Sequence, residues 1–206
     1  QVTRGDDAQV TAGALALDAR DGQPIAGVAL GTAPSGIAVG EGGVWVIDAD
    51  DRTISQIDAE QRSLLRTFST STTPTDVAVG AGAVWIGNAP SRGSVLPTSV
   101  TRLDPDTGLI SDPIQLPPDP GGSRYGILPG LSRQHIAVSP DAVWVVNADL
   151  SVSRIDPRSN RVVARITQLK ARSIAAGEGE VWVTAGNGLA EIDPSTVVTR
   201  RRRALA

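Results

Sequence analysis

The stretch that decides the fold is Gly36–Asp48, which reads GIAVGEGGVWVID. Two short runs of alternating apolar residues flank a Gly-rich centre, which is the pattern of two β-strands joined by a tight turn. In the second run, Val44 and Val46 face one way and Trp45 faces the other. The stretch therefore predicts a β-hairpin.

The same pattern recurs along the chain. Each copy has an aliphatic residue, then Ala, then a Trp seven residues after the Ala. The Ala–Trp pairs are Ala38 and Trp45, Ala78 and Trp85, Ala137 and Trp144, and Ala175 and Trp182. An apolar residue followed by Asp marks a turn five times, at Asp18, Asp58, Asp104, Asp156 and Asp193. A repeat of about 40 residues made of short strands is typical of β-propeller blades.

Each repeat divides into four strands. In the first full unit these are Gly36–Val39, Val44–Ile47, Thr53–Ile57 and Ser63–Phe68. The recurring Ala suits the first strand, which lies nearest the axis where blades converge. The recurring Trp suits the wedge between adjacent blades, so we expect these rings to be core residues.

We therefore expect an all-β fold, a β-propeller of four-stranded antiparallel blades with about five units. The units cover residues 10–30, 34–71, 74–116, 133–168 and 171–206 of a single domain over 10–206. The first unit lacks a recognisable first strand, and its others are expected at Gln9–Ala12, Ala14–Asp18 and Pro24–Leu30. Either five blades close with the first incomplete, or the units belong to a larger ring. Residues 1–9 are interpreted as a linker, with a juxtamembrane position as one reading.

Composition narrows the function classes. The formal net charge is -3, which predicts no general attraction to nucleic acid. The chain has no cysteine, which excludes disulfides and thiolate metal sites. No apolar run approaches the roughly 20 residues that span a bilayer, so no membrane insertion is expected within this segment.

Two insertions interrupt the repeat, at Ala89–Thr98 and Pro117–Leu131. Both are expected on one face of the propeller, where loops on a rigid scaffold carry function. The second contains Arg124 and Tyr125, and a rigid aromatic beside an Arg can anchor an interface. A Pro/Gly-rich spacer with one tucked aromatic is the alternative.

Polar residues precede the first strand of successive units. Asp76, His135 and Arg172, with Gln134, are expected to converge at the channel mouth, where they could bind a small anion or polar ligand. Ordinary polar lining of a wet channel is the alternative. His135 with Asp76 could also act as an acid–base pair, because histidine titrates near neutrality.

A second polar column follows the Trp strand, with Asn88 and Asn147 as candidate ligand-binding residues. Asp48 begins this column and forms an acidic cluster with Asp50 and Asp51 that could hold Ca²⁺. Capping of turns by Asx side chains is the simpler interpretation. The run Arg200–Arg203 is interpreted as a charged edge that resists strand pairing.

The phrases GIAVGEGGVWVID and VSRIDPRSNRVVARI resemble the repeats of virginiamycin B lyase (streptogramin lyase)-like and YVTN-like propellers. The resemblance implies a bacterial sensor or binding propeller. The lyases themselves use a His and carboxylates with a divalent metal on a seven-bladed ring, and here the sole histidine is His135. The start, TRGDDAQV, resembles the stretch after a membrane helix in large actinobacterial signalling proteins, which implies an extracytoplasmic location.

Our functional expectation is a non-catalytic module that binds a small polar ligand or a protein, without a cofactor, as part of a larger bacterial signalling or surface protein. The alternative is a streptogramin lyase-like enzyme that uses His135 and Asp76 with Mg²⁺ or Ca²⁺.

Overall fold

The computed structural model describes residues 12–89, 98–117, 135–177, 179–186 and 188–204. Every regular element in these ranges is a β-strand, as the sequence predicts. None of the described residues forms a helix with the length and hydropathy needed to cross a bilayer.

The strands are β1 (Gly13–Leu17), β2 (Pro24–Ala29), β3 (Pro34–Gly40), β4 (Gly43–Asp48), β5 (Thr53–Asp58), β6 (Ser63–Ser69), β7 (Thr73–Gly80), β8 (Ala83–Ala89), β9 (Ser99–Leu103), β10 (Ile114–Gln115), β11 (His135–Ser139), β12 (Ala142–Val146), β13 (Val152–Asp156), β14 (Arg161–Ile166), β15 (Ala171–Gly177), β16 (Glu180–Ala185), β17 (Gly188–Ile192) and β18 (Thr199–Ala204). They form four sheets of four antiparallel strands, each in sequence order, and one two-stranded sheet of β1 and β2.

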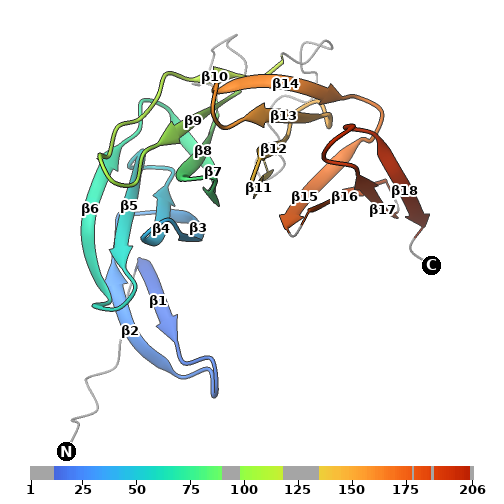
Figure 1. Ribbon diagram of the computed structural model, residues 1–206. Helices are drawn as coiled ribbons and strands as arrows, with labels where there is room; N and C mark the ends of the chain where they lie inside the picture. The colour runs from blue at the N-terminus through green and yellow to red at the C-terminus, as the bar shows by residue number, and fades with distance from the viewer. Residues whose placement is uncertain (1–11, 90–97, 118–134, 178, 187, 205–206) are drawn as a thin grey trace, which may run out of the picture.

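The five sheets follow one another along an open arc, with the first and last sheets at its two ends (Figure 1). The first strands β3, β7, β11 and β15 lie side by side toward the inside of the arc, and the fourth strands lie outside. The propeller architecture is therefore confirmed, and the described residues form an arc rather than a closed ring.

The strand bounds expected in the first full unit are confirmed to within two residues by β3 to β6. In the first unit, β1 and β2 occupy the third and fourth strand positions that the repeat predicts. The expected second strand, Gln9–Ala12, lies outside the described residues except for Ala12.

Residues with positive φ angles form the tight turn of the β3–β4 hairpin. Between β3 and β4, Glu41 and Gly42 both have positive φ, 45° and 77°, and Gly40 pairs with Gly43 across the turn. Two consecutive positive φ angles define the type I′ turn, whose twist matches that of paired strands.

The Asp that ends each third strand caps the next turn, as predicted. Asp58 Oδ1 accepts hydrogen bonds from the backbone N–H groups of Glu60 at 2.8 Å and Gln61 at 2.7 Å. The corresponding carboxylates of Asp18, Asp104, Asp156 and Asp193 also accept N–H groups two residues ahead. These turns therefore fix where each outer strand begins.

Three tryptophans form the core between sheets. Trp45, Trp85 and Trp144 are fully buried, and each packs against the first two strands of the following sheet. In each pair of strands the Trp lies directly opposite the recurring Ala, as Trp85 does opposite Ala78. Cross-strand partners share a face, so the small Ala leaves room for the ring.

Trp182 differs from the prediction of four core rings. It lies in the last sheet, where no further sheet follows among the described residues, and it is only half-buried. Its Nε1 donates to the Glu180 carboxylate at 2.9 Å. Within the described part of the chain, no neighbouring sheet covers this ring as the following sheets cover the other three.

Candidate functional site

The candidate site consists of Asp76, His135 and Arg172, which we call the inner-edge cluster. Asp76 lies in β7, His135 begins β11 and Arg172 lies in β15. These are the first strands of three successive sheets, and β11 contacts both β7 and β15. The structure therefore places the three residues on neighbouring strands. Asp76 and His135 hold corresponding positions of the repeat, whereas Arg172 lies one residue earlier, directly before Ser173, which holds that position in β15.

Asp76 joins two blades. Its Oδ2 accepts a hydrogen bond of 2.8 Å from the backbone N–H of Ile136. Ile136 directly follows His135, so the carboxylate reaches the strand that carries the imidazole. The sequence predicted this proximity, but the repeat pattern could not predict that the contact would be with the backbone.

His135 and Arg172 differ in exposure. His135 is half-buried. It is the first residue of β11 that pairs with β12, and its partner is Val146. Arg172 is exposed at a register shift between Ala171 and Ser173, where the chain bulges. Bulges re-aim a side chain away from the regular pleat. The cluster thus combines a half-buried imidazole with an exposed guanidinium, which suits an anionic ligand.

Asn88 and Asn147, from the second predicted polar column, form hydrogen bonds with the segments beside their strands. Asn88 is buried, accepts a hydrogen bond from Thr72 Oγ1 at 2.9 Å and donates to Thr101 Oγ1 at 3.3 Å. Asn147 is buried as well, and its Nδ2 donates to Ser151 Oγ and Ser153 Oγ, both at 2.8 Å. These contacts hold the segments that flank each second strand, and their partners are side-chain hydroxyls rather than the backbone N–H groups of a capped turn.

The acidic cluster at the end of β4 is also engaged internally. Asp48 is buried, and its Oδ1 accepts the N–H groups of Asp50 at 3.1 Å and Asp51 at 2.9 Å. Its Oδ2 accepts the N–H of Ala33 at 2.7 Å, and Asp51 Oδ2 accepts that of Thr32 at 2.8 Å. Within the described ranges, no three His, Cys, Asp or Glu side chains gather as a metal site.

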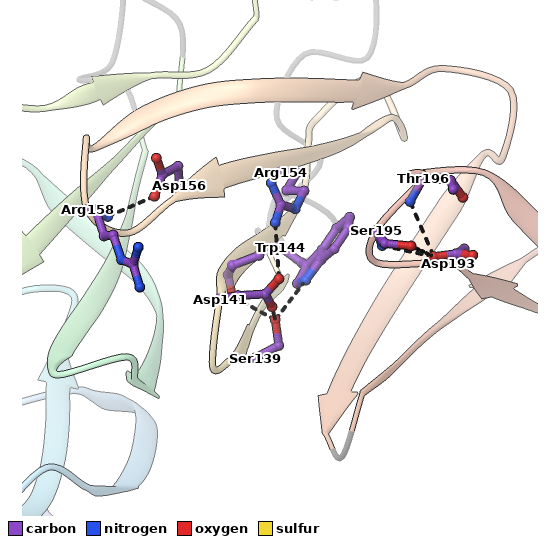
Figure 2. A network of polar contacts seen from close by, with 10 residues as sticks. Ser139, Asp141, Trp144, Arg154, Asp156, Arg158, Asp193, Ser195 and Thr196 are labelled. Atoms are coloured by element: carbon purple, nitrogen blue, oxygen red, sulfur yellow. Dashed lines mark hydrogen bonds and ion pairs between the residues drawn. The ribbon is translucent and has the colours of Figure 1, made fainter.

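A polar network that sequence reasoning missed braces the fourth sheet (Figure 2). Trp144 Nε1 donates to Ser139 Oγ at 3.3 Å, and Ser139 Oγ donates to Asp141 Oδ1 at 3.1 Å. Arg154 pairs with the other Asp141 oxygen at 3.3 Å and lies 5.7 Å from the centre of the Trp144 ring. In two other sheets the Trp indole donates to a glycine carbonyl, of Gly40 or Gly80. Ser139 takes that place here, five residues before its Trp like Gly40 and Gly80, so the aligned repeats did carry this signal.

Sequence reasoning also missed an apolar groove between β1–β2 and the next sheet. The β1–β3 groove has a volume of about 230 Å³ and is lined mainly by Leu15, Val28, Ile37, Val39 and Val44. Ile37 and Val39 are 60% and 71% exposed. The sequence showed the alternating aliphatic residues of this strand. It did not show that their side chains are exposed, because the first unit is incomplete.

Three predicted binding residues, Arg124, Tyr125 and Gln134, lie outside the described residues. So do residues 90–97 and 118–134, which make up most of the two insertions. Their proposed role in binding stays a prediction.

The fold resembles solved propeller structures at low identity. It superposes on Kuenenia stuttgartiensis hydrazine synthase with a TM-score of 0.70 and 14% identity, covering 92% of this chain and 59% of that one. For BamB from Moraxella catarrhalis the values are 0.64, 12%, 90% and 57%. For the Pan2 WD40 domain of Neurospora crassa they are 0.63, 12%, 86% and 55%.

These likenesses confirm the propeller fold. No protein-family model matches the chain, and no curated protein does either. The chain spans between half and three-fifths of the length of the structures it superposes on.

Proposed function

We propose that this chain is a non-catalytic binding module of the propeller type that recognises an anionic or acidic group through His135 and Arg172 of the inner-edge cluster. A role for propellers as binding or scaffold modules is supported in general by the structural neighbours. The resemblance of the repeats to streptogramin lyase-like and YVTN-like propellers supports an extracytoplasmic part of a larger bacterial signalling or surface protein.

One observation carries this proposal. Arg172 is exposed at a bulge of β15, and β15 lies against the strand that begins with His135. A guanidinium presents several N–H donors in a planar fork that matches carboxylate and phosphate oxygens. The neighbouring imidazole adds a donor that becomes cationic when it is protonated. Both groups therefore favour a ligand that carries negative charge.

The single histidine makes a direct test possible. Because the chain contains one His, the imidazole protons of His135 give unambiguous NMR signals. Titration with citrate should move these signals in a saturable way at low ionic strength. Arg172→Ala should weaken the apparent affinity about tenfold, which corresponds to the loss of one charge-assisted contact. Arg158→Ala, at an exposed turn, serves as the control and should leave the titration unchanged. A response that is the same in all three proteins would contradict the assignment.

The enzyme alternative rests on the placement of Asp76 and His135 on adjacent strands. A streptogramin B substrate with Mg²⁺ or Ca²⁺ distinguishes the two functions. We expect no ring opening above the uncatalysed rate. Turnover that is lost in His135→Ala would overturn the binding-module proposal in favour of the lyase.

A further inference from the structure

The β1–β2 sheet is half of a blade. In β5–β6, β13–β14 and β17–β18 the register shifts just before the last apolar residue of the third strand, at Gln56/Ile57, Arg154/Ile155 and Glu191/Ile192. The β1–β2 pair shows the same shift at Ala16/Leu17. This shared irregularity identifies β1 and β2 as the third and fourth strands of a blade, independently of the sequence repeat.

Within the part of the chain that the structure describes, one edge of β1 is consequently open. In the four complete sheets the third strand pairs on one side with the fourth strand and on the other with the second. Among the described residues, β1 pairs with β2 alone. Its other edge presents backbone N–H and C=O groups that a further strand can pair with.

The next sheet shows what else is missing. Val77 is 6% exposed and Ile136 is 8% exposed, because the Trp of the preceding blade packs over the sheet to which each belongs. Ile37 holds the corresponding position in β3 and is 60% exposed. The apolar residues that an indole ring covers in the later sheets therefore have no such cover in β3.

The groove has the size of one large side chain rather than of an organic ligand. Its volume of about 230 Å³ lies below the roughly 300–1,000 Å³ of typical small-molecule pockets. It lies where the Trp of a first blade would enter, between the half-blade and the first sheet that follows. The groove is therefore a fourth site equivalent to the three that bury a Trp, and no Trp among the described residues fills it.

We propose that the β1–β3 groove and the open edge of β1 form a docking surface for a β-hairpin with the pattern of the repeat's own first two strands. Its second strand pairs with β1, and its Trp enters the groove over Ile37 and Val39. Strand addition at an exposed edge draws its affinity from backbone hydrogen bonds and its specificity from alternate side chains. This inference goes beyond the proposed anion site, since it concerns the far end of the arc.

A peptide copied from the chain provides the probe. Residues 73–89, TPTDVAVGAGAVWIGNA, form the β7–β8 hairpin, in which Thr73 pairs with Ala89. Closing the peptide into a ring through a D-Pro–Gly turn pre-organises it, because a free two-stranded hairpin is marginal in water. The control peptide carries Trp85→Ala.

Binding of the labelled peptide is measured by fluorescence anisotropy, and its site by amide hydrogen exchange. We expect one-to-one binding with slowed exchange in Gly13–Leu17, and a loss of more than about tenfold with the Trp85→Ala peptide. The chain variant Val39→Asp should weaken binding to a similar extent. Its matched control is Val163→Asp on outer strand β14, because Val163 is also exposed, and this variant should bind normally. Circular dichroism establishes that both variants fold.

Three results would overturn the proposal. The first is no binding up to the solubility limit of the peptide. The second is equal binding of the Trp85→Ala peptide or of the Val39→Asp chain. The third is a dimer of the chain alone whose β1 amides are already protected and which Val39→Asp disperses, because the occupant would then be a second copy.

Discussion

The carboxylate of Asp76 accepts a hydrogen bond from the backbone N–H of Ile136, 60 residues further along the chain. The contact joins β7 of one blade to β11 of the next at 2.8 Å. At the preceding junction the polar contacts between blades involve turns and an outer strand, where Gly82 N–H donates to Glu41 and Arg66 donates to the carbonyl of Pro105. The bond from Ile136 to Asp76 instead joins two first strands, so it restrains how far these strands can slide.

We therefore expect Asp76→Ala to lower the free energy of unfolding by about 1–3 kcal/mol, because a partly buried N–H loses its acceptor. Urea denaturation measures the effect. Asp76→Asn keeps an acceptor oxygen and should cost less. Equal losses for the two substitutions would show that the charge, rather than this hydrogen bond, stabilises the junction.

Trp85 and Trp182 hold equivalent positions with different surroundings. Trp85→Ala should lower the free energy of unfolding by about 3–5 kcal/mol, because it empties a fully buried site between two sheets. Trp182→Ala should cost clearly less, since this ring is only half-buried. Urea titrations of both variants test the ranking, and a reversed order would show that a cover lies over the last sheet.

Gly108 faces the ring of Phe68 from the neighbouring blade. A Cβ at this position would collide with the Phe68 ring, which is also held 5.3 Å below the guanidinium of Arg66. Gly108 has a φ of 75° as well, so Gly108→Ala adds a clash to backbone strain. Gly42→Ala is the matched control, because its φ is 77° but its surroundings are open.

Gly108→Ala should therefore cost more stability than the roughly 1–2 kcal/mol expected of left-handed strain alone at Gly42. Thermal denaturation of both variants measures the difference. If the two midpoints shift equally, the contact between these blades is looser than the packing of Phe68 indicates.

The turn carboxylates predict an acid-sensitive fold. Hydrogen bonds from Ser195 and then from Arg200 hold the pKa of Asp193 well below its usual 3.8. The backbone N–H of Thr107 lowers the pKa of Asp104, and that of Arg158 lowers the pKa of Asp156. A lowered folded pKa means that the unfolded state binds more protons, so stability rises with pH through this range.

The stabilisation from these turns is thus complete at neutral pH and decreases as the pH falls below about 4. Asp193→Asn should flatten the acid limb of a plot of urea midpoint against pH. Identical acid limbs in wild type and Asp193→Asn would contradict the linkage.

Much of the fold could be predicted because each repeat contains residues that mark where its strands end. The Gly-rich turn before Trp45 and the Asp after Ile57 mark strand ends locally, and β3 to β6 follow them closely. Inter-blade distances have no such local signal. The bond from Asp76 to Ile136 depends on the curvature of the arc, and the exposure of Val39 depends on what is absent beside it.

The candidate site was predicted in part for the same reason. Corresponding positions in successive repeats must lie near one another, so the grouping of Asp76 and His135 on neighbouring strands could be predicted. The internal contacts of Asn88 and Asn147 could not be predicted. They depend on the hydroxyl groups of Thr72 and Ser153, which lie at different sequence separations from the two Asn residues.

Within the described residues, each blade of the arc packs against its immediate neighbours, since the Trp clusters join adjacent sheets and the two ends lie apart. Such a molecule behaves as a linear array whose units are coupled in pairs. We therefore expect heat or force to unfold it one sheet at a time from its ends inward.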